Sequence, residues 1–193
     1  QRLRETALLN PGLEISLTDE RSGQAETFRF THGLADFVRE LLHGREALVP
    51  PIEISDEREW EGRNLALDVA VTWSDGFHDD RLRSYVNIVR TADGGTHEEG
   101  FRRALTTTLN RFGRDSGALL KKDPNLTGDD VREGMVAVVS IKLPEPQFEG
   151  QTKGRLGSTI ARSYVEQVVA DALATWLARN KAKGSQIGKR AAV

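Results

Sequence analysis

The chain has 193 residues, of which 38% are hydrophobic and 29% are charged, a balance typical of a folded, water-soluble domain. It contains no cysteine, which excludes disulfides, thiolate metal sites and thiol nucleophiles. It has neither an apolar run long enough to cross a bilayer nor a signal-peptide pattern, so we expect one cytoplasmic domain with no membrane partner.

The charge is unevenly distributed along the chain. The formal net charge of −2 disfavours a dedicated nucleic-acid binder, because phosphate contacts need a strongly basic face. Residues 151–193, however, hold eight Lys or Arg against two acids, which leaves −8 on the first 150 residues. The C-terminal segment is therefore the part that favours polyanions. A solvated basic helix surface explains the same pattern equally well.

Hydrophobic periodicity predicts short elements in the first half of the chain. They are a helix over 2–9, a hairpin over 13–17 and 26–30, a helix over 33–43, and strands over 52–54, 65–71 and 85–89. Pro11 and Gly12 end the first helix, since proline lacks the amide donor and glycine tolerates a left-handed turn. The strand at 85–89 is expected to pair antiparallel with 65–71 across Asp75 and Gly76.

The second half holds longer elements. Thr96 and Glu99 have the spacing of a capping box, which predicts a helix from Thr96 to about Phe112. Polar side chains gather on one face of that helix; they are Arg103, Asn110, Arg111 and Arg114. The run 135–143 lacks alternation, as expected of a central strand buried on both faces, and 158–179 is predicted as a long helix. Together these elements predict a mixed α/β class, an α+β two-layer sandwich.

No complete active site is recognisable in the sequence. Residues 184–190 resemble a phosphate-binding loop, but they have too few residues between the glycines and end in Arg190 where Ser or Thr would hold magnesium. The segment that begins at His97 lacks the second histidine of a zinc protease motif, and the four histidines show no metal-ligand spacing. Asp79 and Asp80 are adjacent carboxylates of a polar stretch and are interpreted as solvated. We therefore predict no metal site.

A glycine-flanked loop at 150–154 carries Gln151 and Lys153 between the predicted buried strand and the last helix. A lysine ammonium on a flexible stem can reach a terminal phosphate as a point charge, and a neighbouring glutamine can donate to the same oxygens. An ordinary exposed lysine fits the same residues, so the loop is uninformative by itself.

Three longer motifs occur in order: DGGTHEEGFR at 93–102, LTGDDVREG at 126–134 and PQFEGQTK at 146–153. Together they resemble the successive signatures of the ATPase subunits of type IIA topoisomerases. The resemblance covers essentially the whole chain from Arg2 onward and includes WSDGF at 73–77. The bacterial gyrase B branch fits better than the E subunit of topoisomerase IV, although both share the motifs.

The resemblance implies a transducer domain with a fold similar to the second domain of ribosomal protein S5. It also implies a fragment that is inactive alone, since the family's pocket for ATP and magnesium lies in a preceding ATPase domain. By matching position, Lys153 would be the catalytic contact to the terminal phosphate of ATP, with Gln151 assisting. Arg102 would line a DNA-sized cavity between two transducers, and Arg103 and Arg111 from the polar helix face are expected to join it.

On this basis the chain divides into three parts. Residues 1–12 are a remnant of the connection from the missing ATPase domain, 13–179 are the transducer domain, and 180–193 are a basic C-terminal linker or the start of another element. The implied function couples ATP binding and hydrolysis to DNA strand passage and supercoiling. The expected partners are the ATPase domain of the same chain and, in the holoenzyme, the gyrase A subunit and DNA. The fragment is expected to be a monomer.

A DNA mismatch-repair ATPase of the same superfamily is a further possibility, but it should not show all three motifs in this form. Two other functions remain open. One is the corresponding transducer of the topoisomerase IV E subunit. The other is a stand-alone nucleic-acid-binding module, because similar folds occur in ribosomal proteins and the C-terminal segment is basic. The net charge and the lack of interleaved aromatic side chains for base stacking argue against this second alternative.

Overall fold

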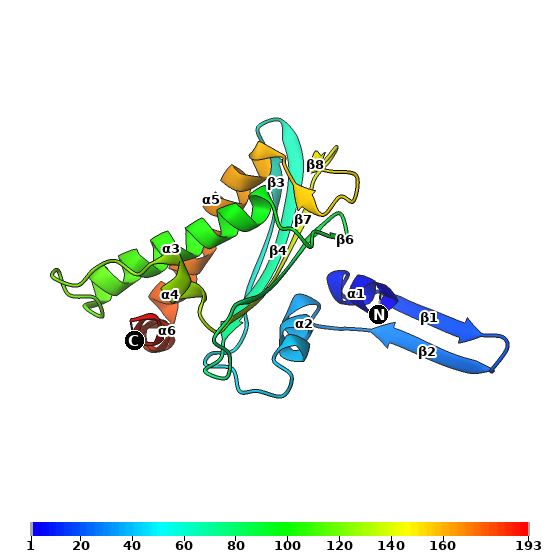
Figure 1. Cartoon of the computed structure of the whole chain (residues 1–193), viewed down its shortest axis with the longest axis horizontal. Coiled ribbons are helices and arrows are strands. Elements are labelled where there is room, and N and C mark those ends of the chain that lie inside the picture. Colours follow the sequence, from blue (N-terminus) through cyan, green and yellow to red (C-terminus); the bar gives the residue numbers. More distant parts are fainter. Residues whose placement is uncertain (1, 193) are drawn as a thin grey trace.

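The computed structural model describes residues 2–192; Gln1 and Val193, the outer ends of the two predicted terminal segments, lie outside the described residues. The helices are α1 (Arg2–Leu9), α2 (Leu34–Leu41), α3 (Thr96–Ser116), α4 (Gly128–Arg132), α5 (Thr159–Arg179) and α6 (Lys181–Ala191). The strands are β1 (Glu14–Asp19), β2 (Gln24–Arg29), β3 (Ile52–Trp60), β4 (Arg63–Trp73), β5 (Arg81–Val86), β6 (Val89–Arg90), β7 (Met135–Lys142), β8 (Phe148–Glu149) and β9 (Arg155–Leu156). Figure 1 shows an elongated molecule in which helices flank a central sheet and one hairpin projects from the body.

The central sheet has five strands in the order β3-β4-β7-β5-β6 (Figure 1). Neighbouring strands are antiparallel except β5 and β7, which run parallel. A parallel pair requires a long connection, and the segment that contains α3 and α4 provides it, because β7 follows these helices in the chain. The predicted mixed α/β class is therefore confirmed.

β7 is buried on both faces, as its mainly apolar run without alternation predicts. Met135 and Ile141 belong to the large core beneath α3 and α5, whereas Val136 and Val138 join a smaller core beneath α1 and α2. All four side chains are fully buried. Helices therefore cover parts of both faces of the sheet, which adds a partial third layer to the predicted two-layer arrangement.

The predicted strand at 85–89 is interrupted, and its predicted partner is wrong. β5 ends at Val86, and Asn87 and Ile88 adopt positive φ values of 47° and 63° in a tight turn into β6. β5 lies beside β7 because β7, with two apolar faces, takes the buried position next to β4. Asn87 suits this turn, since asparagine tolerates the left-handed region and its amide exchanges hydrogen bonds of 2.8 and 2.9 Å with the backbone of Leu143.

The predicted capping box at the start of α3 does not form. Gly95 occupies the N-cap position, and no side chain caps the helix. The hydroxyl of Thr96 instead donates to the carbonyl of Ser158 at 2.7 Å, and the carboxylate of Glu99 binds two arginines of other elements. Tertiary partners thus replace the local cap. A capping box does form at the start of α4, where Thr127 is the N-cap.

The C-terminal segment predicted as a linker forms helix α6, which packs against α3, α4 and α5 (Figure 1, red). Ile187 is 1% exposed and joins the large core. Gly184 permits a close approach, since a Cβ there would lie 2.7 Å from Leu177 and 2.8 Å from Phe112. Packing therefore stabilises a helix whose glycines and lysines predicted a linker, and the apparent phosphate loop at 184–190 lies inside it.

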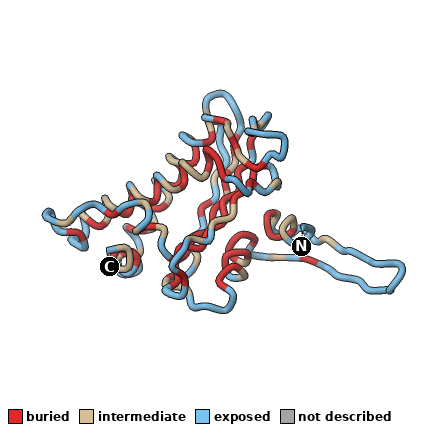
Figure 2. Tube along the Cα trace, in the orientation of Figure 1, coloured by how far each residue is buried: buried red, intermediate tan, exposed pale blue. Residues whose placement is uncertain are grey.

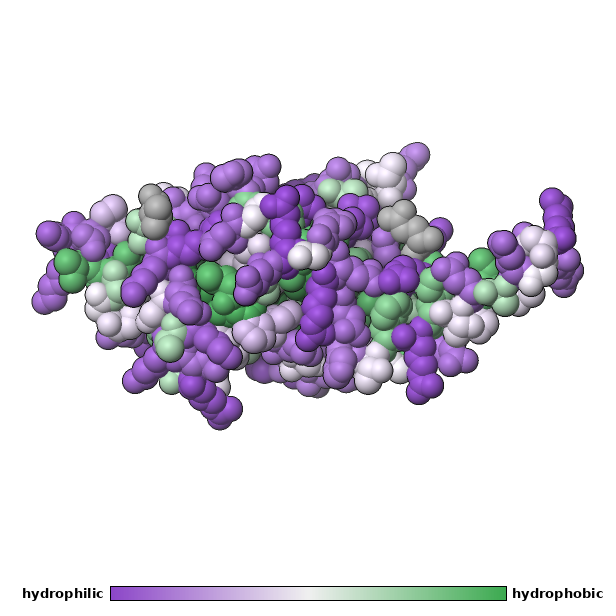
Figure 3. Space-filling model, turned by 90° about the horizontal axis from the view of Figure 1, so that it is seen from below, coloured by the Kyte–Doolittle hydropathy of each residue, from purple (hydrophilic) through white to green (hydrophobic). Residues whose placement is uncertain are grey.

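β1 and β2 form the predicted hairpin, which projects from the body and is largely exposed (Figures 1 and 2). Leu13 and Leu17 are 44% and 50% exposed. In Figure 3 the arm on the right carries hydrophobic side chains among hydrophilic ones. A two-stranded hairpin is marginally stable alone, and α1 supports this one by contacting both strands.

Candidate functional site

Lys153 lies in the exposed turn of a second, short hairpin. Its strands, β8 and β9, pair antiparallel with Phe148 opposite Leu156. Gly150 and Lys153 have positive φ values of 79° and 54°, which turn the chain sharply between the strands. Gln151 and Lys153 are both exposed, and the Lys153 Nζ lies 6.0 Å from the centre of the Phe148 ring. The predicted loop therefore presents its ammonium to solvent between β7 and α5.

The Lys153 hairpin is attached to the loop that precedes α3. The amide of Asp93 donates to the Gly154 carbonyl at 2.8 Å, and the amide of Leu156 donates to the Gly94 carbonyl at 3.0 Å. Gly95 pairs with Leu156 so closely that a Cβ at residue 95 would lie 2.4 Å from the Leu156 carbonyl oxygen. Leu156 itself is fully buried in the large core. The base of the hairpin is therefore fixed, while its turn is exposed.

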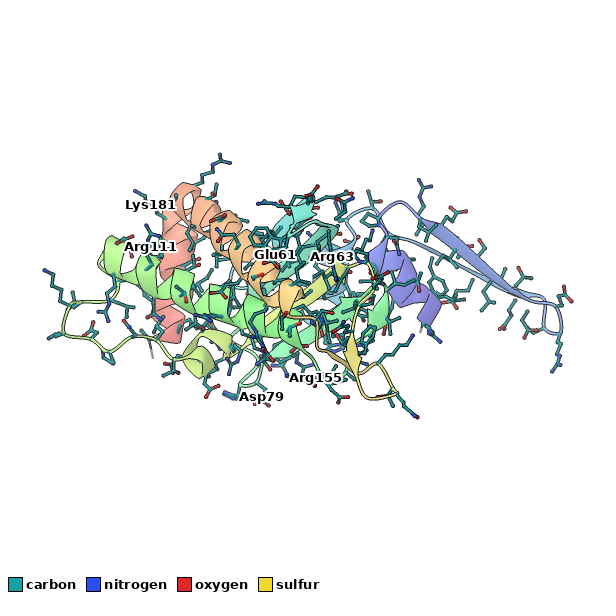
Figure 4. The ribbon with its side chains drawn as sticks, turned by 90° about the horizontal axis from the view of Figure 1, so that it is seen from above. Glu61, Arg63, Asp79, Arg111, Arg155 and Lys181 are labelled. Atoms are coloured by element: carbon teal, nitrogen blue, oxygen red, sulfur yellow. The ribbon has the colours of Figure 1, made fainter. Side chains whose placement is uncertain are left out.

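A bridge of ion pairs provides a second attachment. The Glu99 carboxylate accepts from Arg155 Nη2 at 2.8 Å and from Arg162 Nε at 2.9 Å. Arg155 belongs to β9 and also pairs with Glu149 of β8 at 3.0 Å, whereas Arg162 lies in the first turn of α5. Figure 4 labels Arg155 where the hairpin meets the long helices. The sequence does not predict this bridge, because only folding brings its members together and the local spacing places Glu99 in a capping box.

His97 is fully buried at the same junction. Its Nε2 lies 3.0 Å from the Thr91 hydroxyl, which contacts the Ser84 hydroxyl at 2.6 Å, and Ser84 donates to the Glu98 carboxylate at 2.6 Å. Its Nδ1 has no hydrogen-bond partner among the described residues. Burial lowers the pKa of His97 from its ordinary value of 6.5 to about 4, so the imidazole is neutral at neutral pH. The other histidines are all exposed; they are His32, His43 and His78.

The burial of His97 predicts a loss of stability in mild acid. The unfolded chain binds a proton at this imidazole below about pH 6.5, but the folded chain does so only near pH 4, so the free energy of unfolding falls between these values. The His97→Gln variant has no side chain at residue 97 that binds a proton in this pH range. Between pH 7 and about pH 4.5, the variant should therefore lose on the order of 2–3 kcal/mol less stability than the unmodified chain. Urea unfolding at the two pH values measures the difference, and an identical pH dependence would contradict a neutral buried imidazole.

The three arginines predicted to face DNA do not form one cluster. Arg102 has a side chain that is 32% exposed and pairs with Asp80 at 3.1 Å. Arg103 pairs with Glu166 of α5 at 3.1 Å. Arg111 is 83% exposed and lies about 13 Å further along α3, given a rise of about 1.5 Å per residue. Contact between these arginines and DNA stays a prediction, and each of the three already lies beside a carboxylate, Arg111 beside that of Asp115 at 3.9 Å.

Two members of the predicted polar face of α3 have structural roles. The Asn110 side chain donates to the Leu126 carbonyl at 2.9 Å and accepts from the Leu126 amide at 2.7 Å. Arg114 donates to the Asp123 carbonyl at 2.7 Å. These bonds hold the 117–127 loop against α3. The predicted polar face is therefore not a continuous surface for a ligand.

A groove of about 380 Å³ lies at the other end of α3 from the Lys153 hairpin. It runs between α3, α5 and α6, contains the apolar side chains Phe112 and Leu177, and is bordered by Arg111 and Lys181. Figure 4 labels the last two residues at one end of the molecule, far from Arg155. The groove and the hairpin are therefore separate features.

Neither a cluster of metal-ligating side chains nor a membrane-spanning helix occurs among the described residues. No group of three or more His, Asp or Glu side chains among residues 2–192 is placed to hold a metal ion. None of the described helices is both long enough and apolar enough to cross a bilayer. The chemistry near Lys153 is thus that of an ammonium and an amide presented on a fixed hairpin.

Comparisons of the sequence with known proteins agree with one another. The sequence model of a family described as DNA gyrase B matches residues 33–193. The DNA gyrase B subunit of Streptomyces coelicolor is 42% identical in a comparison that covers 97% of this chain and 30% of that protein. The DNA topoisomerase 4 B subunit of Streptococcus pneumoniae is 44% identical over 193 residues, which cover 99% of this chain and 29% of that protein. The chain thus spans about 30% of the length of these relatives.

A comparison of structures gives the same result. The crystal structure of the 43K ATPase domain of Thermus thermophilus gyrase B, in complex with an aminocoumarin, is similar with a TM-score of 0.88 and 34% sequence identity. The similarity covers 98% of this chain and 50% of that chain. The fold described above therefore occurs within a longer ATPase region of that protein.

Proposed function

The chain belongs to the DNA gyrase B family, and on that premise we propose that it is the transducer domain of a bacterial type IIA topoisomerase subunit. In this role it couples ATP binding and hydrolysis in a preceding ATPase domain to DNA strand passage and supercoiling. The motifs at 93–102, 126–134 and 146–153 support the proposal. The share of about 30% of the relatives' length supports a fragment that is inactive alone.

The observation that carries the proposal is the presentation of Lys153. Its side chain is exposed on a turn whose base is fixed to the buried Leu156 and to the loop before α3. An ammonium held in this way can enter a pocket of another domain while the domain that carries it stays folded. The same turn presents Gln151, which can donate to the same phosphate oxygens.

The coupling follows from the difference between triphosphate and diphosphate. A terminal phosphate gives the Lys153 ammonium a charge-assisted hydrogen bond that a diphosphate cannot offer. The docked orientation of the two domains is therefore favoured only before hydrolysis, and loss of the phosphate releases it. Phosphoryl transfer requires mainly positioning and charge stabilisation, which one inserted ammonium supplies.

α5 is the element suited to carry the motion away from the hairpin. It begins three residues after β9 and has 21 residues, which corresponds to a length of about 30 Å. Buried side chains along it join the large core, so the helix moves with the body of the domain. Its far end meets α6.

We retain the predicted division of the chain as part of this proposal, with one change. Residues 1–12 connect to the ATPase domain and 13–179 form the transducer, while 180–192 join its body through α6. The family match begins at residue 33, so the projecting hairpin lies outside it. We propose that the exposed Leu13 and Leu17 contact the preceding domain. The gyrase A subunit and DNA remain the proposed holoenzyme partners, and the isolated chain a monomer.

The Lys153 hairpin is poorly suited to hold magnesium. The ion prefers oxygen ligands in an octahedral arrangement, and the Lys153 hairpin presents an ammonium and an amide. The described residues place no acidic cluster where it would hold the ion. Magnesium supplies charge neutralisation on the phosphates when it is bound, and Lys153 adds a fixed positive charge from this chain.

ATP turnover by the full-length subunit carrying Lys153→Ala is the direct test of the proposal.

A second prediction concerns the isolated 193-residue chain, which should give no measurable heat when titrated with ATP. Its hairpin provides one phosphate contact and no site for the base or the ribose. Tight ATP binding measured by calorimetry would place the nucleotide pocket within this chain. It would contradict the proposal that the pocket lies in the preceding ATPase domain.

The two branches of the family remain distinct candidates. The identity to a topoisomerase 4 B subunit, 44%, is close to the identity to a gyrase B subunit, 42%. Reconstitution with the partner subunit distinguishes the two branches. A gyrase introduces supercoils into relaxed DNA when ATP is supplied, so this result identifies the gyrase branch.

A further inference from the structure

One carboxylate links the Lys153 hairpin to both long helices. Glu99, in the first turn of α3, accepts from Arg155 of β9 at 2.8 Å and from Arg162 of α5 at 2.9 Å. Arg155 is only two residues from Lys153. We propose that Glu99 is a positioning residue that holds the hairpin against the N-terminal ends of α3 and α5, so that movement of the Lys153 amine is passed to both helices. This inference rests on the proposed contact between Lys153 and a triphosphate.

The two helix ends behave as one unit. Gly100 follows Glu99, and a Cβ at Gly100 would lie 2.4 Å from the backbone oxygen of Arg162. The helices therefore meet backbone to backbone at this point. Beneath them Phe101 and Tyr164 are fully buried in the same core. Because close-packed elements shift as bodies and do not deform continuously, a displacement at this end is carried along both helices.

The bridge is better suited to positioning than to stability. Its three side chains are 39–44% exposed, and ion pairs of such exposure contribute little to folding. Without the Glu99 charge, Arg155 keeps Glu149 as a partner at 3.0 Å, but Arg155 and Arg162 then repel each other. The hairpin stays folded through its backbone hydrogen bonds, while the charge-assisted link from Arg155 through residue 99 to Arg162 of α5 is weakened.

The Glu99→Gln variant of the full-length subunit, assembled with its partner subunit and DNA, tests this role. We expect ATP turnover to fall about twofold and the linking-number change per ATP hydrolysed to fall about fivefold, with an unchanged melting temperature. The linking-number change per ATP is informative because it is a ratio of two rates. A loss of folded protein lowers the rate of supercoiling and the rate of ATP hydrolysis equally and leaves this ratio unaltered. Glu57→Gln removes an exposed carboxylate from β3 and serves as the matched control, with turnover and ratio unchanged.

A double-mutant cycle with Arg155→Gln tests the bridge itself. If Glu99 acts through Arg155, the double variant loses no more coupling than the more affected single variant. If the double variant loses as much coupling as the two single variants together, the proposal is overturned. An unchanged ratio in Glu99→Gln also overturns it, provided that Lys153→Ala inactivates the same enzyme. If Lys153→Ala leaves ATP turnover unchanged, the proposed function fails first, and the role of Glu99 fails with it.

Discussion

Lys153→Ala is expected to lower ATP turnover by the full-length subunit about 10²–10³-fold, the range seen when one group that stabilises developing charge is removed. Under the proposed function the loss is large, because the Lys153 ammonium would contact the oxygens that carry the charge of the phosphoryl group in the transition state. Alanine offers no charge and no donor. Steady-state ATP hydrolysis, measured with the partner subunit and DNA present, gives the effect.

The fold should not change in this variant. Lys153 is exposed, and its Nζ lies 6.0 Å from the Phe148 ring, so the free energy of unfolding should shift by no more than about 0.5 kcal/mol. Lys122→Ala removes another exposed loop lysine and should leave turnover unaltered. Turnover of Lys153→Ala within about twofold of the unmodified subunit would refute the role of this lysine.

Gly95→Ala is expected to cost about 3–5 kcal/mol of folding free energy. Residue 95 has φ 135° and ψ −165°, a region that is essentially restricted to glycine and strains other residues by about 1–3 kcal/mol. The new Cβ would also lie 2.4 Å from the Leu156 carbonyl oxygen and 2.5 Å from its amide nitrogen. Neither atom can move freely, since Leu156 is buried and its amide is hydrogen-bonded to Gly94. Denaturant unfolding of the chain measures the loss.

Gly188→Ala is the matched control for that substitution. Residue 188 lies inside α6, and a Cβ there would meet no atom within 4 Å. Alanine should therefore stabilise the chain by about 0.5–1 kcal/mol, because glycine is a poor helix former. Equal effects of the two substitutions would show that the close approach of Gly95 to Leu156 is not a stabilising feature of the fold.

The candidate site is predictable only in part. Lys153 and Gln151 follow from a glycine-flanked loop between a buried strand and a long helix, and the structure confirms their exposure. Their contact with phosphate stays a prediction. The local spacing places Glu99 in a helix cap, but in the folded chain Arg155 and Arg162 bind its carboxylate. Spacing along the chain does not reveal partners that are 56 and 63 residues away.

The sequence by itself determined the family, the mixed α/β class and the approximate position of most elements. It could do so because periodic burial and turn chemistry are local properties, as β7 and α5 show. Tertiary structure decided which strand lies beside β5, how α3 begins, and that residues 181–191 form a helix. In each case the free energy comes from contacts between distant segments: the two apolar faces of β7, the bond from Thr96 to Ser158, and the burial of Ile187.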